Sequence, residues 1–287
     1  MSGNAIVGVT LSSVLWAGRA GAEDALVMHL RYRRADPKRG ADQWQVVREK
    51  ARWDPGRMAV IVVDMWDKHW CAGASARVDE MAPSMNRVLS RIRDRGALII
   101  HAPSDTMAAY ADTPQRRLAQ EAPTVEPPAE LATWQGLDPA KEPPLPIDDS
   151  DNGCDDEPQC EIHQAWTAEH PWIEVAPEDA ITDSGPEVYN LLSERGIRDV
   201  LVMGVHTNMC VLGRPFGIRR LVGSGLNVVL VRDLTDTMYN SRMAPHVSHF
   251  RGTELVIEHI ERHWCPTITS ADLTGEPRFR FRGNEEE

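Results

Sequence analysis

The residue with the clearest potential for chemistry is a cysteine at the junction of two patterns. In VLVMGVHTNMCVLGRPFGIRR, residues 200–220, Cys210 follows the polar turn His206-Thr207-Asn208. The apolar run predicts a buried strand, and the pattern after it predicts a helix beginning near the cysteine. A helix N-terminus offers unpaired N–H groups and about half a positive charge, which stabilise a thiolate or an oxyanion. Cys210 is therefore a candidate nucleophile, although a lone cysteine at such a junction is often a small buried hydrophobe.

Polar and aromatic side chains also follow the other predicted strands. The carboxyl ends of parallel strands meet at one edge of a sheet, where ligands bind, so we expect these side chains to surround Cys210. Trp66, His69 and Trp70 could line a pocket, and the alternative is that one or two of them pack beneath a covering loop. Arg214 lies one helical turn beyond Cys210 and is a candidate for holding an anionic substrate. The full set of candidates is Asp64, Trp66, His69, His101, Asp105, Thr207, Asn208, Arg214 and Asp233.

Strands and helices alternate along most of the chain, which predicts an α/β fold with a mostly parallel sheet covered on both faces. The buried β-branched run at 58–64 and the run at 97–101 predict two such strands, joined by a helix over 78–95 that stops at Gly96. The other expected strands cover 25–35, 198–205 and 227–233, and the stretch 43–53 fits a strand or a short helix. Further helices are expected over 186–197 and from Cys210 to Gly225, and residues 252–264 suggest a strand turning into a helix.

A long stretch rich in proline interrupts this alternation. Residues 114–177 hold 11 of the 20 prolines and the acidic run DDSDNGCDDE. This composition predicts an insertion, at about 106–175, that lies over the core with little regular structure. The acidic run does not fit a calcium-binding EF-hand, because Gln159 takes the twelfth position, where the bidentate glutamate belongs. We interpret it as a solvated acidic loop.

The composition indicates a soluble globular protein with one main domain over residues 23–287 and a core at about 55–265. The chain has 287 residues and a net charge of −12, which argues against non-specific nucleic-acid binding. No apolar run is long enough to span a membrane. Ala20-Gly21-Ala22 fits the cleavage site of a signal peptide over residues 1–22 in a secreted or periplasmic protein. No Lys or Arg precedes the apolar stretch, however, and the alternative is a disordered leader on a cytoplasmic protein.

The cysteines leave two interpretations open. Disulfides between Cys71 and Cys265 and between Cys154 and Cys160 would leave Cys210 free to act as a nucleophile. Five reduced cysteines are the alternative, and the sequence does not decide between them.

Two motifs resemble those of the isochorismatase-like cysteine hydrolases, the superfamily that includes isochorismatases and nicotinamidases. AVIVVDMWDKHW resembles the family's opening strand VIDMQNDF, and VLVMGVHTNMCV resembles LVLAGVATNVCV. The resemblance covers about residues 55–260. It implies a three-layer α/β/α sandwich, frequent oligomerisation, and hydrolysis of amides or vinyl ethers in small molecules without a redox cofactor.

The resemblance also implies roles for individual residues. Asp64 matches the aspartate that acts as a base towards the thiol, and Cys210 matches the nucleophile. Val205–His206 falls where the family has a cis peptide that does not involve proline. The backbone N–H groups of His206 and Cys210 would then form the oxyanion hole.

The sequence departs from the family in two respects. The family's catalytic lysine would fall near Pro177 or Glu178, and no lysine occurs after Lys141. Lys68, Arg214, Arg232 or a histidine are the candidate substitutes. The nicotinamidase metal motif D-x-H is also absent, so no cofactor is expected, with His101 and Asp105 as the candidates if a metal ion does bind.

Two functions are consistent with these observations. The first is a cysteine hydrolase acting on a carbon–nitrogen or related bond of a small molecule. The second is a catalytically silent relative that keeps the fold for binding or scaffolding and has lost the lysine. The presence of Asp64 and Cys210 favours the first, and the missing lysine favours the second.

Overall fold

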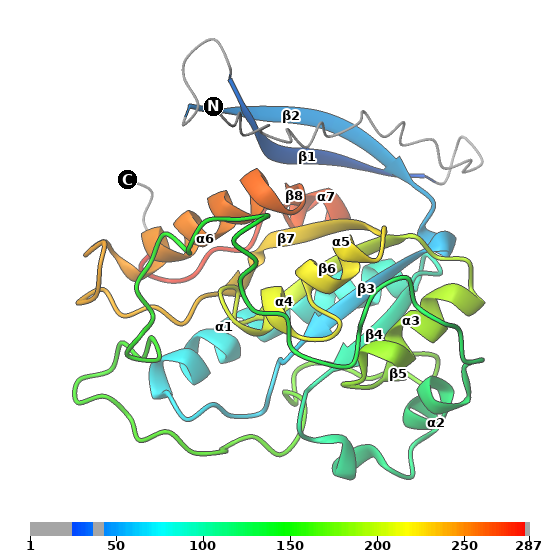
Figure 1. Ribbon diagram of the computed structural model, residues 1–287. Helices are drawn as coiled ribbons and strands as arrows, with labels where there is room; N and C mark the ends of the chain where they lie inside the picture. Colours follow the sequence, from blue (N-terminus) through cyan, green and yellow to red (C-terminus); the bar gives the residue numbers. More distant parts are fainter. Residues whose placement is uncertain (1–24, 37–42, 285–287) are drawn as a thin grey trace, which may run out of the picture.

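The computed structural model describes residues 25–36 and 43–284, built around one sheet of eight strands (Figure 1). The strand order is β2-β1-β8-β7-β6-β3-β4-β5. The expected signal peptide at residues 1–22 lies outside the described residues. The strands are β1 (Leu26–Ala35), β2 (Trp44–Trp53), β3 (Met58–Val63), β4 (Leu98–Ala102), β5 (Ala180–Ile181), β6 (Asp199–Val205), β7 (Asn227–Asp236) and β8 (Thr267–Ile268).

The sheet is mixed and mostly parallel, which confirms the predicted fold class. Strands β8, β7, β6, β3, β4 and β5 run parallel to one another, whereas β1 runs antiparallel to β2 and to β8. The stretch 43–53 is therefore a strand rather than a short helix. Strand β6 pairs with β3 such that Gly204 lies opposite Val63. This pairing brings the two strand ends that carry the candidate nucleophile and base side by side.

Helices cover both faces of the sheet, and the core lies in the two layers between them. Val60 and Val62 of β3 pack with α1 on one face, and Ile61 and Val63 pack with α3 to α6 on the other. Burial on both faces explains why β3 is apolar at every position. The helices are α1 (Ala72–Arg93), α2 (Pro114–Glu121), α3 (Gly185–Glu194), α4 (Cys210–Gly213), α5 (Ile218–Gly223), α6 (His249–His263) and α7 (Ala271–Thr274), with short 3-10 turns η1 (Pro55–Arg57) and η2 (Met107–Tyr110).

Three helices differ from the sequence-based expectation. Helix α1 begins at Ala72, six residues before its apolar pattern suggests. The helix expected from Cys210 to Gly225 is broken into α4 and α5, since Pro215 lacks the N–H that would continue the helix. Residues 252–264 contain no strand: α6 is helical through His263 and buries one face through Val256, Ile257 and Ile260.

Strand β7 also differs from the expectation, because it continues past Asp233 to Asp236 after an irregularity in its pairing with β6. Asp233 therefore does not reach the strand-end edge. Its carboxylate accepts hydrogen bonds from the backbone N–H groups of Ser270 and Phe279. Asp236 takes the strand-end position instead.

The proline-rich part of the chain contains helix α2 and then no helix or strand between Glu121 and Ala180. In Figure 1 this segment, in green, runs around the outside of the helical layer. Polar anchors hold it to the core. Glu142 is buried and accepts hydrogen bonds from Arg219 Nε at 2.6 Å and from His259 Nε2 at 2.7 Å.

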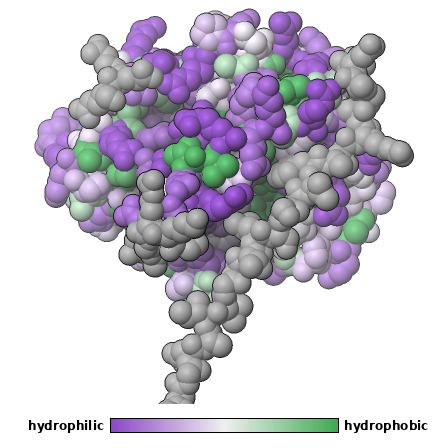
Figure 2. All heavy atoms as spheres, turned by 90° about the horizontal axis from the view of Figure 1, so that it is seen from above, coloured by the Kyte–Doolittle hydropathy of each residue, from purple (hydrophilic) through white to green (hydrophobic). Residues whose placement is uncertain are grey.

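All five cysteines are free, so the suggested disulfides do not form. Cys71 cannot pair with Cys265, because Cys71 packs with Cys154 in one small cluster and Cys265 packs in the core beneath α6. Within the described residues, no helix is long and apolar enough to cross a membrane. Where Figure 2 shows the face nearest β1 and β2, it is mostly hydrophilic, and its hydrophobic residues lie in small separate patches.

Candidate active site

Asp64 and Cys210 meet at the carboxyl edge of the sheet. Asp64 directly follows β3 with a φ of +46°, and Cys210 is the first residue of α4. The Cys210 thiol and the Asp64 carboxylate lie close enough for each group to shift the pKa of the other. Gly204 makes this approach possible, since a Cβ at that position would lie 2.0 Å from the carbonyl oxygen of Val63.

The Asp64 carboxylate is fully buried and has two further donors. The backbone N–H of Ser104 lies 2.8 Å from Oδ1, and Arg214 Nε lies 2.9 Å from Oδ2. Burial raises the pKa of Asp64, and the positive charge of Arg214 opposes this rise most strongly among the neighbouring groups. The guanidinium thus supports a buried carboxylate that desolvation alone would neutralise.

The sulfur of Cys210 keeps its proton in the resting protein. Burial and the nearby Asp64 charge raise its pKa well above the usual value, whereas Arg214 and the backbone N–H of His206 lower it. The peptide bond between Val205 and His206 is cis, and its N–H is directed at the sulfur. Cys210 is 9% exposed, so it is nearly buried but not sealed.

Aromatic rings form one wall beside these residues. Trp66 stacks on Trp166 with ring centroids 4.3 Å apart, and His69 stacks against both rings. His69 also meets the edge of the His206 ring at 4.8 Å. Asp64, Trp66, His69 and His206 line a small pocket between this wall and the start of α1.

The two histidines of this wall are neutral at physiological pH. Burial, with the charge of Arg77, lowers the pKa of His69 to about 4. Burial likewise lowers the pKa of His206 well below its usual value. Among the described residues, His206 Nε2 has no hydrogen-bond partner although it is buried. It is therefore free to bond a group that enters the pocket.

Two predicted pocket residues instead hold the turn before Cys210, because their polar atoms bond to neighbouring backbone and side chains. Thr207 Oγ1 lies 2.7 Å from Thr235 Oγ1 and is fully buried. Asn208 Nδ2 donates to Asp149 and to the carbonyl of Met238, and its Oδ1 accepts from the Met238 N–H.

His101 is also not a pocket residue. Its ring is fully buried between Glu169, 2.8 Å from Nδ1, and Asp179, 3.1 Å from Nε2. Asp105 is exposed and lies 3.5 Å from Arg214 Nη2. Since both ring nitrogens of His101 are engaged and Asp105 faces a cation, these two residues do not fit a metal ion.

The environment of His101 predicts a pH-dependent stability. Burial lowers its pKa, but the two carboxylates outweigh this effect and raise it to about 9. Because the pKa of His101 is higher in the folded than in the unfolded protein, protonation of His101 stabilises the fold. This contribution, up to roughly 3 kcal/mol, is complete below about pH 6.5 and is lost as the pH rises through about 9. Urea unfolding from pH 6 to pH 9.5 should show this decline. His101→Gln should flatten it, whereas the exposed-residue control His163→Gln should retain it, and an unchanged slope in His101→Gln would contradict the assignment.

Sequence reasoning missed two residues of the site. Trp166 comes from the proline-rich segment, where no pattern indicated that its ring would stack on Trp66. Ser104 contributes through its backbone N–H, which any residue could supply. Its position two residues beyond β4 was the one available signal, since backbone near a strand end commonly meets the ligand edge.

Comparison with known proteins decides the family. The isochorismatase domain matches residues 58–261, which is most of the chain. The chain belongs to the isochorismatase family. This match confirms the resemblance carried by the two strand motifs and establishes an isochorismatase-family hydrolase fold.

Solved structures with a similar fold are distant from this isochorismatase-family chain. A cysteine hydrolase from Pseudomonas syringae pv. phaseolicola is 18% identical, with 78% of this chain and 94% of that chain covered at a TM-score of 0.49. An isochorismatase from Pseudomonas putida is 15% identical, with 77% and 92% covered at a TM-score of 0.46. No match is found among curated protein sequences.

Proposed function

We propose that this isochorismatase-family chain is a cysteine hydrolase that cleaves an amide, or a related carbon–nitrogen bond, in a small molecule. The observation that carries the proposal is the chain of contacts from the Cys210 thiol to the Asp64 carboxylate and on to the Arg214 guanidinium. A nucleophile, a base and a cation that orients the base together make the arrangement that covalent catalysis requires.

The proposed reaction has two halves. Asp64 accepts the Cys210 proton while the sulfur attacks the substrate carbonyl carbon, and the proton then passes to the leaving amine. A thioester on Cys210 remains. Water, deprotonated by Asp64, attacks this thioester, and the acid product leaves as the proton returns to the sulfur.

Backbone N–H groups would hold the negative charge that develops on the carbonyl oxygen. The N–H of His206 is directed at the Cys210 sulfur, and Cys210 begins α4, so its own N–H is not used within the helix. Two such donors at an oxyanion stabilise the transition state. The unpartnered Nε2 of His206 is a further candidate contact for a polar substrate group.

Arg214 takes the place of the family's lysine in this proposal. It lies on the same short stretch as the nucleophile and contacts the base directly at 2.9 Å. Of the other candidate substitutes, Arg232 bonds to Thr267 elsewhere in the sheet. Arginine remains charged at any relevant pH, so it supports Asp64 but does not exchange protons itself.

The competing function is a catalytically silent member that binds a ligand without turnover. The near-complete burial of Cys210 and its raised pKa favour this alternative. The two functions differ in whether the thiol forms an acyl intermediate.

Acyl trapping distinguishes them. The full chain is incubated with p-nitrophenyl acetate, and then with a panel of small amides and N-carbamoyl compounds, quenched in acid and mapped by mass spectrometry. A cysteine hydrolase should acylate Cys210 faster than free glutathione reacts. The adduct should be absent in Cys210→Ala and strongly reduced in Asp64→Asn, while the control variant Cys265→Ser should keep it. Acylation no faster than that of glutathione, or unaffected by Asp64→Asn, would support the silent alternative.

A further inference from the structure

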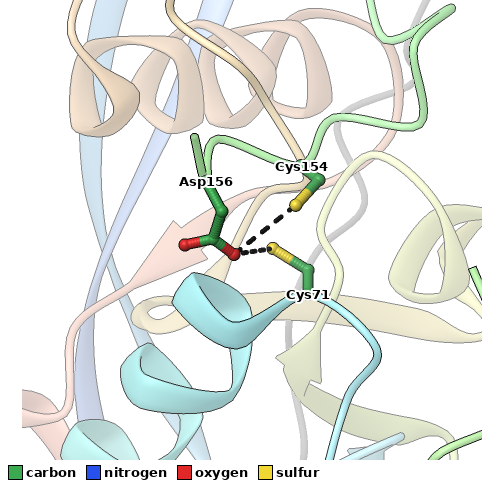
Figure 3. A group of neighbouring side chains, drawn as sticks. All are labelled: Cys71, Cys154 and Asp156. Carbon is green, nitrogen blue, oxygen red and sulfur yellow. Dashed lines mark hydrogen bonds between the residues drawn. The ribbon is translucent and has the colours of Figure 1, made fainter. Parts of the chain in front are cut away.

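A second group of reactive side chains lies apart from Cys210, where the loop at 151–160 meets the start of α1. Cys71 directly precedes α1, and Cys154 and Asp156 lie on the loop, with their sulfurs and one carboxylate oxygen converging (Figure 3). These three ligand atoms all lie within 4.8 Å of one another. Cys160, on the same loop, approaches the same carboxylate. The proposed catalytic chemistry uses none of these four residues.

The distances within this group match those between ligands around a single metal ion. Asp156 Oδ2 lies 3.4 Å from the Cys71 sulfur, 3.5 Å from the Cys154 sulfur and 3.3 Å from the Cys160 sulfur. Zinc–sulfur and zinc–oxygen bonds of about 2.3 and 2.0 Å at tetrahedral angles place a sulfur and an oxygen ligand about 3.5 Å apart. The two sulfurs of Cys71 and Cys154 and the Asp156 oxygen therefore have the spacing of three ligands of a tetrahedral zinc site, and Cys160 approaches the same oxygen as a candidate fourth ligand.

The backbone around the group provides donors that stabilise thiolates. The N–H of Gly73 donates to Asp156 Oδ2 at 3.0 Å, the N–H of Ala72 is directed at the Cys160 sulfur, and that of Ala74 is directed at the Cys71 sulfur. These are the first free N–H groups of the 22-residue helix α1, where the helix dipole also favours negative charge. The backbone N–H groups and the helix dipole would thus stabilise the four anionic ligands in addition to the metal ion.

The loop is held in place on its other side. Gly153 has a φ of +69°, and a Cβ there would lie 2.3 Å from the backbone of Met238, so only glycine allows the loop to lie this close. Arg77 of α1 binds the neighbouring Asp155 through both terminal nitrogens, at 2.9 and 3.1 Å. The ligand loop is therefore fixed to α1 and to the end of β7 around the sulfurs.

We propose that Cys71, Cys154, Cys160 and Asp156 bind one structural Zn²⁺ ion. Three thiolates and one carboxylate select zinc over magnesium or calcium, which prefer oxygen ligands alone. With four protein ligands the ion has no open position for substrate, so its role is structural. Zinc binding would release the protons of the three thiols, because the metal ion binds thiolates.

The zinc ion would also support the turn that carries the nucleophile. Met238 packs with Cys71 and Cys154, and both its backbone N–H and its carbonyl bond to the Asn208 side chain, two residues before Cys210. Fixing this cluster fixes that turn. The proposal does not depend on catalysis, because metal content and stability report on it directly.

The test measures metal content in the full chain. Protein purified from zinc-supplemented medium should contain one zinc per chain by elemental mass spectrometry, and chelation should lower its Tm. The chelated protein, reloaded with Co²⁺, should show thiolate-to-cobalt charge-transfer absorption. Each ligand substitution should weaken zinc binding by more than about 10²-fold, which exceeds the effect of changing a residue that only hydrogen-bonds to a metal ligand. The variants are Cys71→Ser, Cys154→Ser, Cys160→Ser and Asp156→Asn.

Cys265→Ser is the matched control, because it removes a buried thiol elsewhere in the core and should leave the zinc content at one per chain. Folding of each variant is checked by circular dichroism, and Cys160→Ser, at the least buried of the three cysteine ligands, is expected to fold best of the cysteine variants. Zinc well below one per chain after reloading would overturn the proposal, as would a native disulfide among the three ligand cysteines. Unchanged zinc binding in Cys160→Ser would exclude Cys160 as the fourth ligand.

Discussion

Replacing Arg214 with methionine is expected to lower the rate of Cys210 acylation by roughly 10²–10⁴-fold, the range attributed to general acid–base catalysis. Asp64 is fully buried, and the guanidinium is the principal group that opposes the rise of its pKa. Without this charge the pKa of Asp64 rises further and the carboxyl group is protonated at neutral pH, so it cannot accept the thiol proton. The measurement is the acylation rate with p-nitrophenyl acetate as a function of pH.

The pH profile separates this role from a merely structural one. Activity requires ionised Asp64, so the rate should rise with pH through the Asp64 pKa, and Arg214→Met should move that rise to higher pH. Arg214→Lys keeps the charge and should lose about tenfold or less. The control Arg220→Met removes a nearby arginine that pairs with Glu130 and should leave the profile unchanged. An unshifted profile in Arg214→Met would show that another group supports Asp64.

Replacing Arg77 with methionine is expected to destabilise the fold by about 3–5 kcal/mol, the cost of removing one partner from a buried ion pair. Arg77 Nε donates to Asp236 Oδ2 at 2.7 Å, and the Asp236 side chain is fully buried. The neighbouring His249 and Arg77 hold the pKa of Asp236 well below its usual range in spite of burial. Loss of the guanidinium leaves this buried carboxylate with His249 alone, and chemical unfolding at neutral pH measures the change.

Arg87→Met is the matched control, because it lies on the same helix α1 but is exposed and 3.9 Å from Glu276. It should change the free energy of unfolding by no more than about 0.5 kcal/mol. The double variant Arg77→Met/Asp236→Asn should recover part of the loss by removing the unpaired charge. Equal effects of Arg77→Met and Arg87→Met would show that the pair with Asp236 does not stabilise the fold.

The parallel core and the two strand ends could be predicted from sequence because their signals are local. The runs of β3, β4 and β6 are apolar except for His101 and Asp199, and such short apolar runs are typical of strands buried on both faces. Asp64 directly follows β3, and Cys210 follows β6 after the turn at 206–209, so their meeting required that the two strands pair. The register that places Gly204 opposite Val63 supplies that pairing.

The rest of the site depends on long-range packing that no local pattern encodes. His101 lies near the carboxyl end of β4, much as Asp64 lies at the end of β3, yet Glu169 and Asp179, about seventy residues away, enclose it in the core. Thr207 and Asn208 are as polar as a pocket requires, but Thr207 bonds to Thr235 at the end of β7 and Asn208 bonds to Met238 just beyond it. The single helix predicted from Cys210 to Gly225 overlooked the break at Pro215, and the position of Arg214 beside Asp64 depends on long-range packing.

The side chain that meets Asp64 comes from the turn bearing the nucleophile, four residues along the chain. In the proposed mechanism, residues 210–214 therefore supply both the attacking sulfur and the cation beside Asp64, and no catalytic residue is needed near Pro177. Its neighbour Asp179 instead ties Arg93 and His101 together. Substitutions near Pro177 should therefore change the stability of the fold rather than the reaction. Transferring residues 204–214 to another protein of this fold should transfer Cys210 and Arg214 together, leaving only Asp64 to be supplied.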